Sequence, residues 1–478
     1  MKDPRVGLVT FGDERPHEWE AVFRAMTEAR HEEARRWLGG LPVELEADPA
    51  VARTRPEIDA QVERLARAGV EALVAHVPCW TAPNLVVRAV QRLGLPTVLL
   101  SNRSAATHGT VALLGAGGAL DQIGYPHLRV REELDGGAAG RAVLPFVRAA
   151  AAVARIRGEV FGHFGGRSLG IDTGTFDPMQ WRELFGVDVE HVDQLEIVRR
   201  AEQIGEERAG PMVRWLTEGA GRVDYDDRLT PEKLSLEVRC YLATKDLIAE
   251  KGLDFVAVKC MPDLSTHVVP QCVSAALLPS DHDGDGPREP VVMACEADGD
   301  GAMTGELLKH VSGGLPTLFA DVSNFDDATQ TLYLTNCGGF CAWYAARSSV
   351  PEENLARIEL RPANRAAGGA ITYFRAAPGP LTLARLFRRA GRYHLAIARA
   401  DAVEPTADQV DRFVAARGPH QLPTAFVRLR VGFDRLVAGF GSNHISGVAG
   451  DHAAELEHVC RLLGIEPVAL EDAPAVVA

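Results

Sequence analysis

The first third of the chain alternates short apolar runs with longer stretches in which apolar residues recur every three or four positions. The short runs predict strands, and the longer stretches predict amphipathic helices. The expected strands are 5–12, 43–47, 70–78 and 95–102, and the expected helices are 16–38, 56–69 and 84–94. This alternation predicts a doubly wound α/β domain in which crossover helices connect parallel strands.

A glycine-rich segment, 113–124, follows these elements and raises the question of dinucleotide binding. The fingerprint G-x-G-x-x-G would place its third glycine at Leu120, and no acidic residue ends a following strand. Both features are needed to bind a pyrophosphate and a ribose at the start of a helix. The segment therefore predicts a closely packed helix start, and it argues against an NAD-linked dehydrogenase.

The rest of the chain changes character once, near residue 346. Before it, helices are expected at 194–216 and 231–252, and strands at 254–260, 290–295 and 316–320. After it, short extended runs predict an antiparallel barrel or sandwich, which a helix at 451–464 follows. The predicted fold class is therefore α/β, with two N-terminal doubly wound domains, 1–157 and 158–345, followed by a mainly β, barrel-like domain, 346–478.

The composition indicates a globular protein and argues against some classes of function. The chain has 478 residues, of which 46% are hydrophobic and 24% charged, as in soluble globular proteins. Its net charge of -14 argues against nucleic-acid binding, which needs a basic surface. The N-terminus lacks the pattern of a signal peptide, no apolar run is long enough to span a membrane, and the eight scattered cysteines suit reduced thiols. A cytoplasmic location is expected, and the pair Cys337 and Cys341 predicts structural thiols.

Two carboxylates end strand-like runs in the second region. Glu296 follows the apolar run 291–295, and Asp321 follows 316–320, with a predicted helix between them. A strand–helix–strand unit makes the two strands parallel, so both acids are expected at one rim of the sheet, where such folds bind ligands. The sequence thus predicts a joint site for Glu296 and Asp321, whereas Asp298 and Asp300 are interpreted as turn or cap residues. The acidic segment 281–286 fails as a calcium loop because Pro287 follows its glycine.

A second polar cluster lies in the glycine-rich segment 439–452. His444 follows Asn443 there, among small residues that allow a backbone to pack closely against a ligand. Two carboxylates and one imidazole would suit Mn²⁺ better than Mg²⁺. His452 is interpreted as a residue at the start of the last helix.

These segments resemble the L-fucose isomerase family, metal-dependent aldose–ketose isomerases that share their fold with L-arabinose isomerases. The matching stretches are EPVVMACEADGDGAM (289–303), GGLPTLFADVSNF (313–325), TNCGG (335–339), GSNHISGVAGDHAAEL (441–456) and LLGIEPV (462–468). Weaker matches are VGLVTFGDERP (6–16), VPCW (77–80) and GGRSLGI (165–171). Because the matches span the chain in order, they are more specific than any single motif.

The resemblance implies a site and a reaction. It makes Glu296, Asp321 and His444 the ligands of a divalent cation, usually Mn²⁺. The implied reaction interconverts an open-chain aldose and its ketose through a cis-enediol. Glu296 would be the base and Asp321 its partner, or the reverse.

The resemblance also implies how the sugar is held. Asn443 would contact the sugar, and Arg15 and Trp80 would reach it from a neighbouring subunit of a homotrimer or homohexamer. The family's partners are small sugars, with no nucleic acid or membrane.

Two departures fall in the implied sugar pocket. Cys337 replaces a serine of the family, and the segment 259–265 replaces a strand end that contains glutamine. The identity of the sugar therefore stays open. An anionic sugar such as sulfoquinovose could be bound by Lys259, Arg167 or Arg375. A non-catalytic sugar-binding protein is a further alternative.

Overall fold

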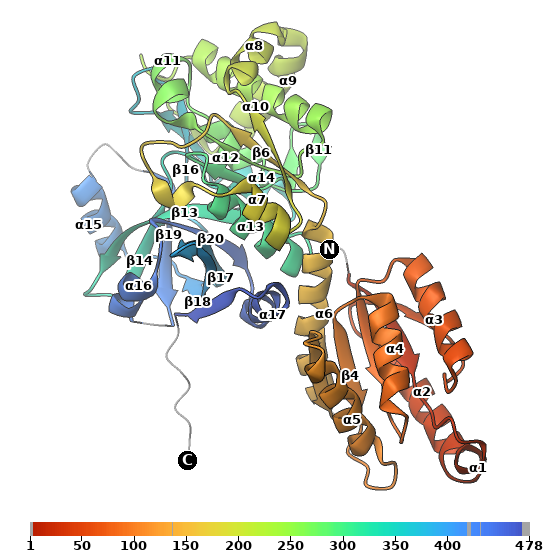
Figure 1. Cartoon of the computed structure of the whole chain (residues 1–478). Helices are drawn as coiled ribbons and strands as arrows, with labels where there is room; N and C mark the ends of the chain where they lie inside the picture. Colours follow the sequence, from red (N-terminus) through yellow and green to blue (C-terminus); the bar gives the residue numbers. More distant parts are fainter. Residues whose placement is uncertain (1–2, 136, 418–421, 431, 471–478) are drawn as a thin grey trace. The chain divides into compact units, whose positions relative to one another are not determined.

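The computed structural model describes residues 3–135, 137–417, 422–430 and 432–470 (Figure 1). The chain divides into two compact units. The N-terminal unit comprises 1–155 together with 454–464, and the second unit comprises 156–453 together with 465–478. The three predicted domain ranges, 1–157, 158–345 and 346–478, stay predictions. Among the described residues, no helix combines the length and the apolar character that crossing a membrane requires.

The N-terminal unit is built on a five-stranded parallel sheet with the order β2-β1-β3-β4-β5. Its strands are β1 (Arg5–Thr10), β2 (Glu44–Ala47), β3 (Ala72–His76), β4 (Thr97–Ser101) and β5 (His127–Arg131). Its helices are α1 (Pro16–Glu18), α2 (Arg24–Gly39), α3 (Arg55–Ala68), α4 (Pro83–Leu93), α5 (Gly109–Gln122) and α6 (Ala138–Ile156). This strand order is that of a doubly wound fold, which confirms the expected architecture.

Alternate residues of β1 face opposite sides of this sheet. Val9 belongs to a core with residues of α3, α4 and α5, whereas Val6 and Leu8 belong to a core with residues of α2 and α6. The glycine-rich segment 113–124 is helical as expected, but it forms the body of α5 and not its start. Two layers of helices therefore cover the sheet, and each is held by its own apolar cluster.

The second core also receives a helix from the far end of the sequence. Helix α17 (Ala453–Leu463) contributes Leu462 to this cluster. Glu455 of α17 pairs with Arg148 of α6 at 3.4 Å, and His458 lies edge-on to Phe146. The N-terminal unit is therefore completed by residues that follow almost all of the chain.

The second unit contains a smaller parallel sheet and its helices. The sheet order is β12-β9-β6-β7, with β6 (Val160–Phe164), β7 (Asp188–Val192), β9 (Phe255–Val258) and β12 (Met293–Cys295). The longer helices of this region are α7 (Pro178–Leu184), α8 (Leu195–Gln203), α9 (Glu206–Gly219), α10 (Pro231–Lys251), α12 (Cys272–Leu277) and α13 (Gly299–Val311). The expected helix 194–216 is two helices, because the chain leaves helical geometry at Ile204.

The same unit contains a six-stranded antiparallel barrel. The order β17-β20-β13-β14-β19-β18 is closed by pairing of β17 with β18, and β21 (Glu466–Ala469) adds to β18 in parallel. The six strands are β13 (Thr317–Asp326), β14 (Thr331–Thr335), β17 (Gly379–Arg389), β18 (Arg392–Ala402), β19 (Thr424–Leu429) and β20 (His444–Ala449). The expected barrel-like part is therefore confirmed. A separate sheet joins β8 (Arg222–Val223), β15 (Glu359–Pro362) and β16 (Ala370–Tyr373).

The expected strand–helix–strand unit around α13 is wrong. β12 is an edge strand of the parallel sheet, where it pairs with β9. β13 instead pairs antiparallel with β14 and β20 in the barrel. Apolar runs on either side of a helix predict two strands, but they do not tell whether the second strand returns to the first sheet. Glu296 and Asp321 therefore do not share one rim of one sheet as predicted, although the two residues still lie close together.

Candidate functional site

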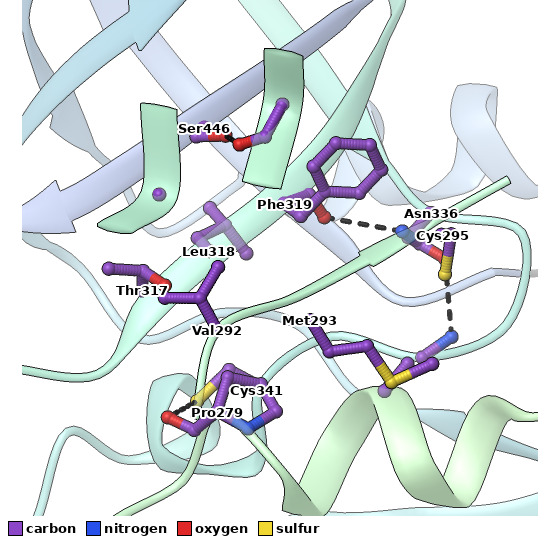
Figure 2. Close-up of a pocket in the computed structure, with 14 residues that line it drawn as sticks. Pro279, Val292, Met293, Cys295, Thr317, Leu318, Phe319, Asn336, Cys341 and Ser446 are labelled. Atoms are coloured by element: carbon purple, nitrogen blue, oxygen red, sulfur yellow. Dashed lines mark hydrogen bonds between the residues drawn. The ribbon is translucent and has the colours of Figure 1, made fainter. Parts of the chain in front are cut away.

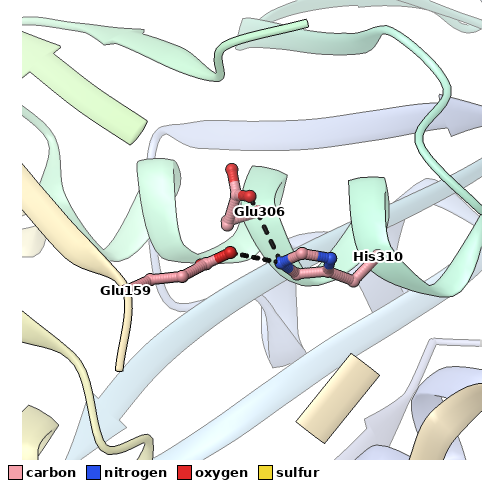
Figure 3. Close-up of side chains that lie close together, drawn as sticks. All are labelled: Glu159, Glu306 and His310. Atoms are coloured by element: carbon pink, nitrogen blue, oxygen red, sulfur yellow. Dashed lines mark hydrogen bonds and ion pairs between the residues drawn. The ribbon is translucent and has the colours of Figure 1, made fainter. Parts of the chain in front are cut away.

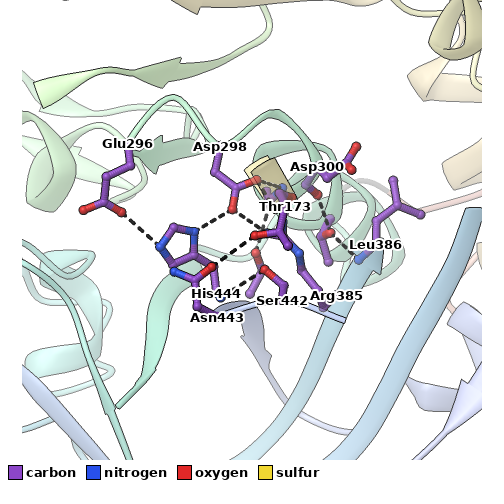
Figure 4. A network of polar contacts seen from close by, with 12 residues as sticks. Thr173, Glu296, Asp298, Asp300, Arg385, Leu386, Ser442, Asn443 and His444 are labelled. Carbon is purple, nitrogen blue, oxygen red and sulfur yellow. Dashed lines mark hydrogen bonds and ion pairs between the residues drawn. The ribbon is translucent and has the colours of Figure 1, made fainter. Parts of the chain in front are cut away.

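Three side chains converge between the parallel sheet and the barrel of the second unit. Glu296 follows β12, Asp321 lies within β13, and His444 is the first residue of β20. The Nε2 atom of His444 lies 3.0 Å from Oε2 of Glu296 and 3.3 Å from Oδ1 of Asp321. Figure 4 shows His444 between the carboxylates of Glu296 and Asp298. The structure thus brings together all three residues that the resemblance names as ligands.

The backbone explains how these residues meet. Asp321 and His444 are direct partners in the antiparallel pairing of β13 with β20, so their side chains leave the same face of the barrel wall. Glu296 reaches them from a turn in which it and Ala297 have φ values of 55° and 53°. Residues with side chains rarely adopt this left-handed conformation, and such strain concentrates at functional sites. The turn therefore supports a functional role for Glu296.

Asp298 fixes the orientation of His444. Its Oδ2 lies 2.7 Å from Nδ1 of His444, while its Oδ1 accepts a hydrogen bond of 2.8 Å from the amide of Gly301 and caps α13. A carboxylate that accepts the Nδ1 proton leaves the lone pair of Nε2 free for a ligand. The interpretation of Asp298 as a cap residue is thus correct but incomplete.

Arg385 of β17 holds Asp298 in turn. Its Nη1 donates to Oδ2 of Asp298 at 2.6 Å, its other terminal nitrogen, Nη2, donates to Oδ1 at 3.0 Å, and Nη2 also donates to the carbonyl of Thr173 at 2.6 Å. The side chains of Arg385 and Asp298 are 0% and 1% exposed. Two parallel hydrogen bonds in a buried setting fix both groups, so the barrel wall positions His444 through Asp298.

Close packing around this network requires a glycine at position 301. A Cβ atom there would lie 2.5 Å from the ring of Phe319 and 2.8 Å from Nη1 of Arg385. The ring of Phe319 also packs against His444, with centroids 4.9 Å apart. The imidazole is therefore held by an aromatic face as well as by Asp298.

The electrostatics of the cluster are those of a cation site. Burial disfavours the imidazolium, but contacts with Asp298, Asp321 and Glu296 raise the pKa of His444 well above its usual value. Burial likewise disfavours the carboxylate of Asp298, but Arg385 and His444 hold its pKa well below the usual range. In the protein alone, a proton on His444 therefore supplies the positive charge that the acids favour.

The donor set fits a divalent cation. The Nε2 atom of His444 is buried and has no partner in hydrogen-bonding geometry, although two carboxylate oxygens lie close to it. One imidazole nitrogen and two carboxylate oxygens are ligands that Mn²⁺ and similar ions accept. Glu296, Asp321 and His444 would hold such an ion, and Asp298 would orient the imidazole from behind.

Asp300 belongs to the layer behind Asp298. It is 2% exposed and accepts a hydrogen bond of 2.9 Å from the hydroxyl of Tyr393, which also accepts one of 2.8 Å from Trp181. Burial raises the pKa of Asp300 to about 7. This residue therefore fastens the start of α13 to β18 and points away from His444.

Of the three predicted sugar contacts, one lies beside His444 and the other two lie in the N-terminal unit. Asn443 is exposed beside His444, and its side-chain oxygen accepts a hydrogen bond of 3.1 Å from Thr173. Arg15 and Trp80 belong to the N-terminal unit, where Arg15 pairs with Asp13 at 2.6 Å and Trp80 packs on an aromatic cluster. The sugar-binding roles of all three residues remain predictions.

A small cavity lies beside Cys295, the residue before Glu296. It is lined by Met293, Cys295, Phe319, Asn336 and others, and its volume of about 10 Å³ is roughly that of one water (Figure 2). A hydrogen bond of 3.3 Å from the amide of Asn336 to the carbonyl of Phe319 crosses this region. The cavity is too small to hold a sugar, whereas the side chain of Asp321 is 36% exposed.

Sequence reasoning missed Arg385. The signal was present, because this arginine interrupts the apolar run of 381–387 within a strand. A charge inside a core strand needs a buried partner of opposite sign, and Asp298 and Asp300, interpreted from the sequence only as turn or cap residues, were available. What the sequence could not provide was the pairing of β17 beside β20, which brings Arg385 to α13.

Two segments of the chain match models of a known protein family. Residues 3–158 match the model of the first N-terminal domain of L-fucose isomerase, and residues 334–470 match the model of its C-terminal domain. The chain belongs to the L-fucose isomerase family. His444 and Arg385 lie in the second of these segments, whereas Glu296 and Asp321 lie between the two.

The individual relatives are distant from this chain. A sulfoquinovose isomerase of Alkalicoccus urumqiensis is 23% identical over 70% of this chain and 73% of its own length. An L-fucose isomerase of Haemophilus influenzae is 25% identical over 56% of this chain and 51% of its own length. An L-fucose isomerase of Phocaeicola vulgatus is 30% identical over 34% of this chain. The chain thus spans about half the length of the Haemophilus relative.

Solved structures give no further guidance. A periplasmic solute binding protein of an ABC transporter from Actinobacillus succinogenes, with bound D-allose, is 13% identical over 55% of this chain and 80% of its own, with a TM-score of 0.16. A likeness this low carries no argument about function.

Proposed function

We propose that this protein is a metal-dependent aldose–ketose isomerase of the L-fucose isomerase type. The observation that carries the proposal is the convergence of Glu296, Asp321 and His444, with the buried Nε2 of His444 free of hydrogen bonds. Family membership supports the reaction class, since two segments of the chain match L-fucose isomerase domains.

The proposed roles follow from position and chemistry. When bound by Glu296, Asp321 and His444, a divalent cation such as Mn²⁺ supplies Lewis-acid polarisation of a sugar carbonyl. Glu296 is 8% exposed and is held by its strained turn, so its carboxylate has a fixed direction. Asp321 is 36% exposed and faces the side from which an open-chain sugar can approach. His444 is kept in one tautomer by Asp298.

The proposed reaction moves one proton between neighbouring carbons. Glu296 removes the proton from C2 of the aldose, and the electron pair of that C–H bond forms the C1=C2 bond. The π pair of the C1 carbonyl moves to its oxygen, which takes a proton from Asp321 to complete the cis-enediol. A proton is then returned to C1 while the C2 hydroxyl loses its own proton, which gives the ketose. Asp321 is the partner that moves the proton between the two hydroxyl oxygens. Neither step changes the overall composition of the sugar.

A panel of sugars tests the reaction and its metal requirement together. Protein stripped with EDTA should be inactive, and added Mn²⁺ should restore conversion of one aldose to its ketose, because the cation site is part of the machinery. L-Fucose, D-arabinose, L-arabinose, other hexoses and sulfoquinovose form the panel, with ketose formation as the readout. If no sugar is converted and one binds tightly without metal, the protein is a sugar-binding protein instead.

A second candidate, an isomerase of an anionic sugar, is favoured by one arginine. Arg365 donates a hydrogen bond of 2.9 Å to the carbonyl of Cys337, the position at which this chain departs from the family pattern. Among the described residues, no carboxylate lies within ion-pairing distance of Arg365. Lys259 and Arg167, by contrast, pair with Asp263 and Asp172. The relative named sulfoquinovose isomerase gives this candidate its specific sugar.

A network of contacts joins Arg365 to the cluster. Cys337 follows Asn336, and the side-chain oxygen of Asn336 accepts from the thiol of Cys295 at 3.6 Å. Cys295 directly precedes Glu296, so Arg365 lies at the border of the proposed sugar pocket. A guanidinium there would bind a sulfonate or another anionic group with two hydrogen bonds.

The substitution Arg365→Met should discriminate between the two candidates. If the substrate is anionic, the Michaelis constant for sulfoquinovose should rise by about 10- to 100-fold while the turnover number changes little, because one charge-assisted contact is lost. Steady-state kinetics with sulfoquinovose and a neutral aldose measure this. Arg357→Met, at an exposed position without a described ion pair, is the matched control. An equal effect on both sugars would contradict a role in recognising the anion.

A further inference from the structure

A second group of metal-ligating side chains lies along α13, away from the cluster around His444. Glu159, Glu306 and His310 each place one ligand atom within 4.8 Å of those of the other two. Figure 3 shows one ring nitrogen of His310 facing the carboxylates of both Glu159 and Glu306. We propose that these three residues form a second divalent-cation site, with a structural role and a preference for first-row transition ions such as Zn²⁺.

The spacing of the residues favours a shared ligand. Glu306 and His310 are four residues apart on α13, so they share one face of the helix. Glu159 directly precedes β6 and reaches the same point from the neighbouring sheet. The Nε2 atom of His310 lies 2.8 Å from Oε1 of Glu159 and 3.3 Å from Oε1 of Glu306. Two carboxylate oxygens and one imidazole nitrogen form a donor set that Zn²⁺ accepts.

Buried carboxylate oxygens without hydrogen-bond partners also point to a cation at this place. The side chain of Glu306 is 0% exposed, and its Oε2 has no hydrogen-bond donor; the same holds for the buried Oε2 of Glu159. A buried carboxylate oxygen without a partner costs about 1–3 kcal/mol. A cation held between the two carboxylates would supply an interaction that both side chains lack.

The charges around the group are also unbalanced. Lys309 forms an ion pair with Glu306 and donates a hydrogen bond of 3.4 Å to the carbonyl of Pro290, so it neutralises one acid. Lys309 also acts on Glu159, but the exposed acids Asp254 and Glu289 oppose its effect. A divalent cation would supply the missing charge while Lys309 kept its contact.

This site is distinct from the one around His444. Asp298 caps the first turn of α13, whereas His310 lies in its last turn. Twelve residues at 1.5 Å rise separate the two positions by about 18 Å along the helix. A cation at Glu159, Glu306 and His310 would join the C-terminal end of α13 to the start of β6 and would not touch a sugar at the other end.

Metal content tests the proposal directly. Full-length protein is stripped with chelator, reloaded with Zn²⁺, passed through a desalting column and analysed by mass spectrometry of the elements. The wild type should retain about two ions per chain, and His444→Gln and His310→Gln should each retain about one, because each removes one ligand set. The double variant should retain none, and His282→Gln, a half-buried histidine outside both groups, should behave as the wild type.

Thermal unfolding gives a second readout that does not depend on activity. In the His444→Gln variant, added Zn²⁺ should raise the melting temperature, because a ligand that binds only the folded state stabilises it. Glu159→Gln in that background should abolish the shift, and it also serves if His310→Gln fails to fold. One ion per chain in the wild type together with none in His444→Gln would overturn the proposal. So would a melting shift that survives Glu159→Gln.

Discussion

Replacing Glu296 with glutamine should lower the turnover number of the isomerase by about 10²- to 10⁴-fold, the usual contribution of a positioned base. Glutamine has nearly the same shape and can still donate an oxygen to a cation, but it cannot accept the proton from C2. The turn that carries Glu296 is strained and buried, so the side chain should keep its place. Kinetics at saturating Mn²⁺ separate the loss of the base from weaker metal binding.

Two further measurements make this experiment decisive. Glu404→Gln, an exposed acid without a described ion pair, should leave turnover unchanged. Metal content of Glu296→Gln should be determined on the same sample. Full turnover with metal bound would show that Glu296 is not the base and would transfer that role to Asp321.

Replacing Arg385 with methionine should destabilise the protein by about 3–5 kcal/mol, because it leaves Asp298 charged and unpaired in the interior. Both side chains are almost completely buried, and Arg385 makes two hydrogen bonds to Asp298 and one to Thr173. Urea unfolding measures the free-energy change. Arg375→Met, at an exposed position, is the control and should change it by less than about 0.5 kcal/mol.

A double variant separates the lost charge pair from lost packing. Adding Asp298→Asn to Arg385→Met removes the unpaired carboxylate, so part of the stability should return. The single variant Asp298→Asn should also weaken Mn²⁺ binding by about 10- to 100-fold, since the imidazole of His444 loses the carboxylate that orients it. A double variant no more stable than Arg385→Met would mean that packing, and not charge, dominates the loss.

Much of the fold could be predicted from periodicity. The parallel sheet of the N-terminal unit follows from its alternating strands and helices, and the barrel strands follow from the extended runs after residue 346. The connection through α13 could not be predicted, because a strand at 316–320 looks the same in a parallel sheet and in a barrel wall. Only its pairing partners, β14 and β20, distinguish the two.

The candidate site was predictable to the extent that it lies in short motifs. Glu296, Asp321 and His444 each end or begin a recognisable element, so their residue types and surroundings identified them. Arg385 contributes through the pairing of two strands that lie about 60 residues apart in the sequence. A local sequence pattern does not predict which distant strands pair. The geometry that fixes His444 therefore needed the structure.

The position of α17 has a consequence for synthesis on the ribosome. Residues 454–464 belong to the N-terminal unit, yet β20 just before them and β21 just after them belong to the barrel. Domains usually fold as they emerge, N-terminal first. Here the first 155 residues must wait until nearly the whole chain has been translated before Leu462 can cover their apolar cluster. The part of the protein that is made first is thus among the last to be finished.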